Sequence, residues 1–285
     1  MAVDINTKMV TLLGDPLKQS FAAQMQNCAY EAAGMNMLYF YTEVNNEHLK
    51  DVVNGIRYMN FAGFAVTKPN KVKVLEYLDE LDPLCEKMGA SNTVVRTPEG
   101  KLIGYNTDGI GFVTSIQKEG GIKVDENVYF CIGSGGAGRA MCSALAYYGA
   151  KKIYITDLFE ESSHSLVDDI NNNFAPVAEF VPYGDFSKVA EANVVMNASG
   201  IGMGSHIGEN PMPKECIKAD QFYFDACYNP AKTQFLLDAE EAGASILNGL
   251  GMSLYQGAAQ IKYWTGEEAP IEAMRQKLLD IISGK

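Results

Sequence analysis

The sequence predicts an α/β protein with two lobes. Short runs of β-branched, aromatic and aliphatic residues alternate with longer segments in which apolar residues recur at helical spacing. This alternation occurs twice, in residues 1–107 and again from residue 128 onward, and Gly120 and Gly121 lie between the two series. A chain of 285 residues is long enough for two domains of ordinary size.

The first lobe is expected to contain a largely parallel sheet, because its strands and helices alternate. The alanine-rich segment 20–33 ends at Gly34, a residue type that commonly stops helices. The expected strands are 9–14, 38–44, 61–67, 93–95 and 102–104, and the expected helices are 20–33, 48–59 and 71–81.

The second lobe shows the same alternation after a helix expected at 108–118. Gly243 is placed to end a helix in this lobe, and the single tryptophan, Trp264, lies in an apolar C-terminal tail. The expected strands are 128–132, 153–157, 178–182, 194–197 and 222–226, and the expected helices are 233–242 and two more within 252–282.

Composition restricts the function classes. The formal net charge of −12 argues against nucleic acid or an anionic membrane as the main partner. No segment has the ~20 apolar residues that span a bilayer, and the first residues lack the apolar core of a signal peptide. The 6 cysteines form no C-x-x-C pair and the 3 histidines lie far apart, so neither a disulfide framework nor a metal site is expected. These features favour a cytoplasmic protein that acts on a small molecule.

A glycine-rich loop follows the strand expected at 128–132. It has the spacing G-x-G-x-x-G, a helix-prone segment follows it, and Asp157 ends the next expected strand about 20 residues later. The first glycine permits a tight turn, the second lets the backbone approach a pyrophosphate, and the third lets the helix pack near the strand. This order predicts a Rossmann-type dinucleotide-binding domain, against the alternative of a purely structural turn. The residues of the loop are Gly133, Ser134, Gly135, Gly136, Ala137 and Gly138.

Asp157 also predicts which cofactor is bound. A carboxylate at the end of this strand accepts hydrogen bonds from the adenosine ribose and repels a 2′-phosphate. The next residues are Leu158 and Phe159, so no arginine stands in the turn to neutralise that phosphate. We therefore expect NAD to be preferred over NADP.

Lys71 and Asp108 are the candidates for proton transfer. Lys71 follows an expected strand end and a proline, and Asp108 lies where the chain passes from the first lobe to the second. A lysine and a carboxylate that meet in a cleft can form a proton-transfer pair, in which the ammonium protonates a carbonyl oxygen as hydride arrives. The alternative is an ordinary ion pair that braces two loops. Spacing alone leaves both readings open.

Segments along the whole chain resemble those of the shikimate dehydrogenase family, including its quinate/shikimate relatives. So many segments in one order form a highly specific pattern. The matching residues are 14–16 with Ser20 and Asn27, 66–67 with Pro69 and Lys71, 89–93, 104–109, the glycine loop, 197–199, 228–230 with Thr233, and Gly249 with Met252 and Gln256.

The resemblance implies an activity and a set of roles. The family transfers hydride between a nicotinamide cofactor and shikimate, 3-dehydroshikimate or quinate, a reaction of the shikimate pathway and of aromatic amino acid biosynthesis. It implies that Lys71 and Asp108 are the catalytic pair. The other implied roles are the substrate carboxylate for Ser20, the ring hydroxyls for Thr67, Asn92 and Gln256, the substrate also for Tyr228, and the cofactor for Asn197, Ala198 and Gly249.

The resemblance also implies that the C-terminal helices return to the first lobe. Residues 1–107 and 252–285 would then form the substrate-binding domain, and residues 108–251 the NAD(P)-binding domain. The chain is expected to act as a monomer or a homodimer.

Three departures from the family pattern lie on the substrate side. Ala22 stands where a second hydroxyl is common, Ala65 where an asparagine is common, and Gln19 and Gln26 where histidines are common. Two alternatives therefore stay open. The first is an enzyme whose preferred substrate is quinate or an amino-substituted analogue, which would use the space left by Ala65. The second is a non-catalytic NAD-sensing regulator. If shikimate is the substrate, Gln19 or Gln26 is expected to replace the missing hydroxyl.

Overall fold

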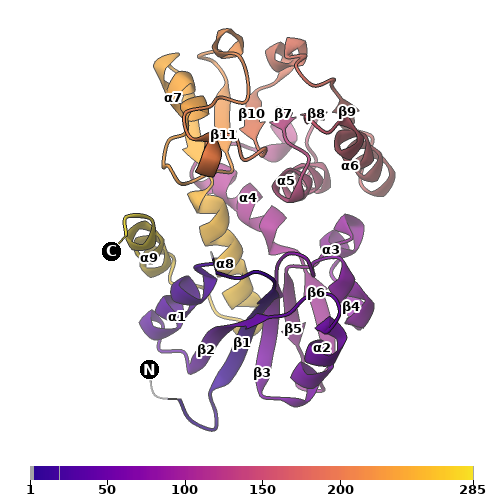
Figure 1. The fold of residues 1–285 in the computed structure, drawn as a ribbon, viewed down its shortest axis with the longest axis vertical. Helices are drawn as coiled ribbons and strands as arrows, with labels where there is room; N and C mark the ends of the chain where they lie inside the picture. Colours follow the sequence, from indigo (N-terminus) through magenta and orange to yellow (C-terminus); the bar gives the residue numbers. More distant parts are fainter. Residues whose placement is uncertain (1–2, 19, 285) are drawn as a thin grey trace. The chain divides into compact units, whose positions relative to one another are not determined.

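The chain forms two compact units, each built around its own sheet (Figure 1). Unit 1 consists of residues 1–107 and 254–285, and unit 2 of residues 108–253. The structure, a computed structural model, describes residues 3–18 and 20–284. Each unit boundary falls inside a helix, in α4 (Thr107–Lys118) and in α8 (Leu250–Thr265).

The sheet of unit 1 has the strand order β2-β1-β3-β5-β6-β4. It is mixed rather than largely parallel, because β5 is antiparallel to both β3 and β6. The tight turn between β5 and β6, closed by a hydrogen bond from Thr97 N to Lys101 O, permits only an antiparallel pair, since a parallel pair needs a long crossover. The strands are β1 (Lys8–Gly14), β2 (Met37–Glu43), β3 (Phe61–Val66), β4 (Glu80–Leu81), β5 (Thr93–Arg96) and β6 (Leu102–Tyr105).

The prediction of a helix at residues 71–81 is wrong. Only a 3-10 helix, η1 (Lys73–Tyr77), forms there, and the chain then pairs with β6 as β4. A second helix, α3 (Pro83–Met88), follows, with Asp82 as its N-cap accepting from Leu84 N at 3.0 Å. Pairing of Glu80 and Leu81 with β6 therefore overrides the helical spacing of the apolar residues in this segment.

The C-terminal helices belong to unit 1, as the predicted fold class requires. The indole of Trp264 donates to the carbonyl of Val94 on β5 at 3.0 Å, and a Cβ atom on Gly63 would lie 2.6 Å from that indole nitrogen. Helix α9 packs against α1, where the thiol of Cys28 donates to Ala273 O at 3.8 Å. Besides α3, η1 and the larger part of α8, the helices of unit 1 are α1 (Ala22–Ala32), α2 (Leu49–Tyr58) and α9 (Ile271–Ile282).

The sheet of unit 2 is fully parallel and confirms the predicted Rossmann-type architecture. Its order, β9-β8-β7-β10-β11-β12, is the doubly wound order 3-2-1-4-5-6 counted within the unit. The sequence did not predict β12, a short and half-exposed edge strand. The strands are β7 (Val128–Ile132), β8 (Lys152–Thr156), β9 (Ala178–Phe180), β10 (Val194–Asn197), β11 (Phe222–Asp225) and β12 (Ser245–Asn248).

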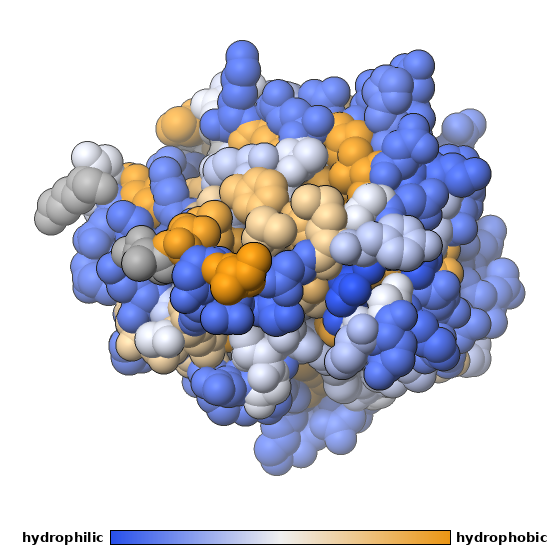
Figure 2. Space-filling view, turned by 90° about the horizontal axis from the view of Figure 1, so that it is seen from below, coloured by the Kyte–Doolittle hydropathy of each residue, from blue (hydrophilic) through white to orange (hydrophobic). Residues whose placement is uncertain are grey.

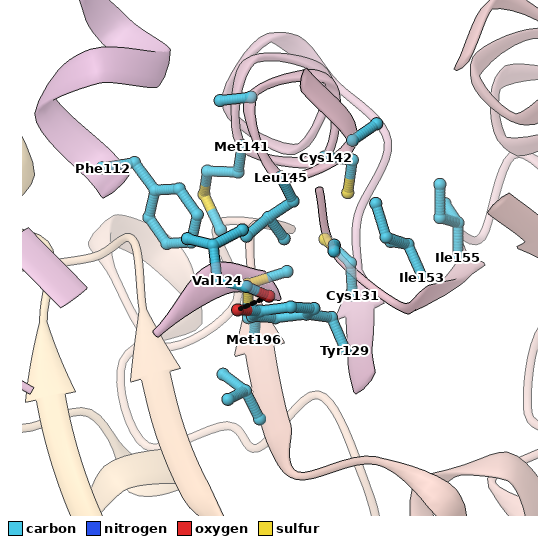
Figure 3. Packing of buried hydrophobic residues seen from close by; sticks show 14 of the residues in the cluster. Phe112, Val124, Tyr129, Cys131, Met141, Cys142, Leu145, Ile153, Ile155 and Met196 are labelled. Atoms are coloured by element: carbon cyan, nitrogen blue, oxygen red, sulfur yellow. Dashed lines mark hydrogen bonds between the residues drawn. The ribbon is translucent and has the colours of Figure 1, made fainter. Parts of the chain in front are cut away.

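Both faces of this sheet are covered, which explains why its strands are apolar on both sides. Tyr129 and Cys131 of β7 pack into one cluster, whereas Phe130 and Ile132 pack into another. Figure 3 shows part of the first cluster, where Met141 and other residues of α5 pack with the strands and the Tyr129 hydroxyl donates to Val124 O at 3.1 Å. The helices of unit 2 besides α4 are α5 (Gly136–Tyr147), α6 (Glu160–Asn173), α7 (Gln234–Glu241) and the short 3-10 helices η2 (Val124–Glu126), η3 (Ser187–Glu191), η4 (Gly204–His206) and η5 (Lys214–Cys216).

Hydrophilic residues occupy most of the face drawn in Figure 2, and hydrophobic residues form smaller patches between them. None of the helices within residues 3–18 and 20–284 is long and apolar enough to cross a bilayer. The 6 cysteines, all within these residues, are free thiols.

Candidate active site

The glycine loop lies where β7 meets its neighbour β10, the point at which the strand order of unit 2 reverses. Gly133 has a φ of 107°, and a Cβ atom there would lie 2.5 Å from Ser199 N. A Cβ atom on Gly138 would lie 1.9 Å from the carbonyl oxygen of Gly133. Both positions therefore require glycine for close packing of the backbone.

Gly135 differs from these two glycines. It is exposed, and no described atom lies within 4 Å of the position that its Cβ would take. Gly135 is also the N-cap of α5, whose first turn has no acidic residue and no side-chain cap among the described residues. The amides of this turn can therefore bind an anion, and the open space beside Gly135 lets a pyrophosphate approach the backbone.

Asp157 follows β8 and joins that strand end to the glycine loop. Its Oδ2 accepts hydrogen bonds from Ser134 N at 2.6 Å and Ser134 Oγ at 3.0 Å, and its Oδ1 accepts from Phe159 N at 2.9 Å. A carboxylate has about four acceptor positions, so these three bonds fix its orientation and leave capacity for a ribose hydroxyl. Arg139, the basic residue that follows the loop, forms an ion pair with Asp169 of α6.

Asn197 belongs to a buried polar network at the ends of β10 and β11. Its Nδ2 donates to both oxygens of Asp225 at 3.1 Å, and its Oδ1 accepts from Ser199 N and Ser199 Oγ. Asp225 also accepts from Thr233 Oγ1 at 2.5 Å and Cys227 N at 2.9 Å. Burial raises the pKa of Asp225, and these donors partly oppose the shift. The network holds the chain after β10, including Ala198, beside the glycine loop.

Asn92 of unit 1 is held by hydrogen bonds from two neighbouring threonines. It is 2% exposed, and its Oδ1 accepts from Thr107 N at 2.7 Å, Thr93 Oγ1 at 2.8 Å and Thr107 Oγ1 at 3.1 Å. Three donors on one oxygen fix the orientation of the amide group.

Two buried glutamines extend this arrangement. Gln260 of α8 donates to Thr93 Oγ1 at 3.0 Å, and Gln26 of α1 donates to Gln260 Oε1 and to Gly257 O, both at 3.1 Å. We call Gln26, Gln260, Thr93 and Asn92 the amide relay. Sequence reasoning missed Gln260, although a glutamine between Ala259 and Ile261 within the predicted C-terminal helices was an available signal.

The hydrogen bonds of Gln26 correct the expectation that this residue replaces the missing hydroxyl. Gln26 is fully buried and its amide donates to two acceptors in the protein, so it is not placed to replace the missing hydroxyl at Ala22. Gln19 lies outside the described residues. Ala65 lies within β3 and is 2% exposed.

Lys71 lies in the turn that follows β3 and Thr67. Its carbonyl accepts from Ser91 N at 2.9 Å, which ties this turn to the segment that holds Asn92. Lys71 belongs to unit 1, and Asp108 is the first residue of unit 2, directly after Thr107.

The remaining candidates lie on several elements. Ser20 stands just before α1, where its Oγ accepts from Ala22 N at 3.3 Å. Gln256 is half-buried on α8 in unit 1. In unit 2, Tyr228 is half-buried and burial raises its pKa, whereas a Cβ atom on Gly249 would lie 2.0 Å from Ala226 O. No group of His, Cys, Asp and Glu in the described part of the chain could hold a metal ion.

Comparison with known proteins matches both ends of the chain to family models. Residues 12–94 match the shikimate dehydrogenase substrate binding domain, and residues 249–279 match the shikimate 5′-dehydrogenase C-terminal domain. A shikimate dehydrogenase (NADP(+)) of Desulforamulus reducens is 37% identical over 95% of this chain and 94% of its own length.

Two solved structures are similar over nearly the whole chain. Shikimate 5-dehydrogenase of Listeria monocytogenes, in complex with shikimate and NAD, is 35% identical with a TM-score of 0.93 and 98% of each chain covered. Quinate dehydrogenase of Corynebacterium glutamicum, in complex with NAD, is 29% identical with a TM-score of 0.89, covering 96% of this chain and 99% of its own.

Proposed function

This chain belongs to the shikimate dehydrogenase family, and from that premise we propose that it interconverts 3-dehydroshikimate and shikimate with a nicotinamide cofactor. The observation that carries the proposal is that the chain contains two separate sets of residues, one suited to a cofactor and one suited to a substrate. Unit 2 contains the glycine loop with Asp157, and unit 1 contains the fixed amide of Asn92 beside the segment of Lys71. A cofactor-binding regulator would need the first set and not the second.

The fit of unit 2 to a dinucleotide rests on the contrast among its glycines. Gly133 and Gly138 face backbone, whereas Gly135 faces open space at the start of α5. A bound nicotinamide dinucleotide supplies the hydride. The amides of the first turn of α5 would bind its pyrophosphate, and Asp157 would bind its ribose.

Lys71 and Asp108 are the proposed proton-transfer pair. During reduction of the carbonyl, a new C–H bond forms as hydride arrives, the C=O π bond breaks, and Lys71 Nζ gives its proton to the oxygen. In the reverse direction the neutral amine takes the proton from the alcohol. Asn92, Thr67 and Gln256 would bind ring hydroxyls of the substrate. Tyr228 would also contact the substrate, and Ser20 would bind its carboxylate.

NAD is the proposed preferred cofactor, although many relatives in this family are NADP enzymes by name. The carboxylate of Asp157 repels a 2′-phosphate, and the adjoining Leu158 and Phe159 offer no positive charge. Arg139 is engaged with Asp169. One uncompensated charge contact of ~1.4 kcal/mol or more corresponds to at least about tenfold in kcat/KM.

Lys71→Ala tests the catalytic part of this proposal. It should lower kcat by roughly 10²–10⁴ while the affinity for NAD, measured by quenching of protein fluorescence, changes little. Lys73→Ala is the matched control, because Lys73 is a nearby surface lysine paired with Glu76. Near-normal turnover of Lys71→Ala would show that the lysine only braces its turn.

A further inference from the structure

Helix α1 begins without a cap from its own N-terminal residues. Its N-cap is Phe21, no described side chain of the cap residue accepts a hydrogen bond from the helix, and the first two helical residues are Ala22 and Ala23. The first amides of a helix have no partner within the helix and need an acceptor from outside. Two hydroxyls supply these acceptors, one from Ser20 and one from Tyr41 of β2.

Tyr41 contacts the chain on both sides of the helix start. Its hydroxyl accepts from Ala23 N at 3.1 Å and donates to the carbonyl of Ser20 at 2.8 Å. Ser20 N in turn donates to Leu17 O at 2.9 Å. The backbone of Ser20 is therefore held at its N–H by the preceding turn and at its carbonyl by Tyr41.

The side chain of Ser20 is held as well. Its Oγ accepts from Ala22 N, so the hydroxyl proton of Ser20 is directed away from the helix and stays available as a donor. A single hydroxyl can bind a carboxylate tightly only if its position is fixed, because ordering it during binding reduces affinity. Tyr41 fixes it from a neighbouring strand.

We infer that Tyr41 is a positioning residue for substrate binding. It caps α1 from outside and orients Ser20 toward the carboxylate of the substrate, an inference that rests on the role proposed above for Ser20. Tyr41 thus makes one serine sufficient at a helix start where Ala22 offers no second hydroxyl. Tyr41 does not contact the reacting atoms, so it should influence substrate affinity and not the chemical step.

Tyr41→Phe tests the inference by removing one oxygen. It should raise the KM for shikimate about three- to tenfold, with kcat within about twofold of the wild type and an unchanged KM for NAD. The methyl ester of shikimate lacks the charge but keeps a carbonyl acceptor, so with the ester the variant should raise the KM less than it does with the acid. A merely structural role of Tyr41 would affect the acid and the ester alike.

Tyr39→Phe is the matched control. Tyr39 lies on the same strand, and its buried hydroxyl has no hydrogen-bond partner within the described residues, so its loss should leave the KM for shikimate unchanged. An unchanged KM in Tyr41→Phe, or an equal effect on acid and ester, would refute the inference. If Ser20→Ala also leaves the KM for shikimate unchanged, the proposed role of Ser20 is refuted together with the role of Tyr41. If Ser20→Ala raises this KM and Tyr41→Phe does not, only the role of Tyr41 fails.

Discussion

Replacing Thr93 with valine interrupts the amide relay at its centre with almost no change in shape. The hydroxyl of Thr93 contacts Asn92 Oδ1 at 2.8 Å, Thr107 Oγ1 at 2.9 Å and Gln260 Nε2 at 3.0 Å, and Thr93 is fully buried. Valine leaves the Gln260 amide without this acceptor, at a cost of ~1–3 kcal/mol, and removes a donor to Asn92 worth ~0.5–1.5 kcal/mol. The free energy of unfolding should therefore fall by about 1.5–4.5 kcal/mol.

The same change should weaken substrate binding to a smaller extent. Asn92 Oδ1 keeps the hydrogen bond from Thr107 N at 2.7 Å, so the amide stays close to its position but is less firmly oriented. We expect the KM for shikimate to rise about three- to tenfold while the KM for NAD stays unchanged.

Urea unfolding and steady-state kinetics of Thr93→Val and Thr93→Ser together test this reasoning. Serine keeps the hydroxyl and loses only a buried methyl group, so it should restore the KM and cost only about 1 kcal/mol of stability. The role given to the amide relay would be refuted if the Thr93→Val variant were as stable as the wild type. It would also be refuted if Thr93→Ser raised the KM for shikimate as much as Thr93→Val does.

Three further predictions concern unit 2. Gly138→Ala should lower the free energy of unfolding in urea by more than about 2 kcal/mol, because the added Cβ atom meets Gly133 O. Gly135→Ala should keep wild-type stability but bind NAD at least about tenfold more weakly. Equal effects of the two substitutions would contradict the roles assigned to these glycines. Burial raises the pKa of Asp225, so the stabilising contribution of its protonated form is present below the ordinary aspartate pKa and is lost as pH rises through the raised pKa. Asp225→Asn should remove this part of the pH dependence of the free energy of unfolding. An identical pH profile in wild type and variant would refute this assignment. Asp157→Asn should narrow the NAD/NADP ratio of kcat/KM by at least about threefold, and an unchanged ratio would show that this charge does not select the cofactor.

Local patterns in the sequence predicted most of the fold of unit 2. Parallel strands covered on both faces are continuous apolar runs, and the spacing from Gly133 to Asp157 is a local signal. The short strand β12 (Ser245–Asn248) gave no such signal. In unit 1 the segment 71–81 has helical spacing, yet its final form depends on pairing with β6, which is remote in the sequence.

The sequence predicted individual site residues better than the contacts that hold them. Ser20 and Asn92 were recognised from motifs, but the partners of their polar atoms come from other elements. Tyr41 reaches Ser20 from β2, and Gln260 reaches Thr93 from α8. Such contacts depend on tertiary packing, so one sequence does not reveal them.

The most direct test of the proposed activity is a coupled measurement of substrate and cofactor choice. Purified protein would be mixed with 3-dehydroshikimate and NADH or NADPH, and in the reverse direction with shikimate or quinate and the oxidised cofactors, while the absorbance of the reduced nicotinamide is followed. We predict turnover of 3-dehydroshikimate and shikimate, abolished almost completely in Lys71→Ala, with NAD(H) preferred at least about tenfold. Binding of NAD without turnover of any of these cyclic acids would contradict the proposed activity and would favour a cofactor-sensing regulator.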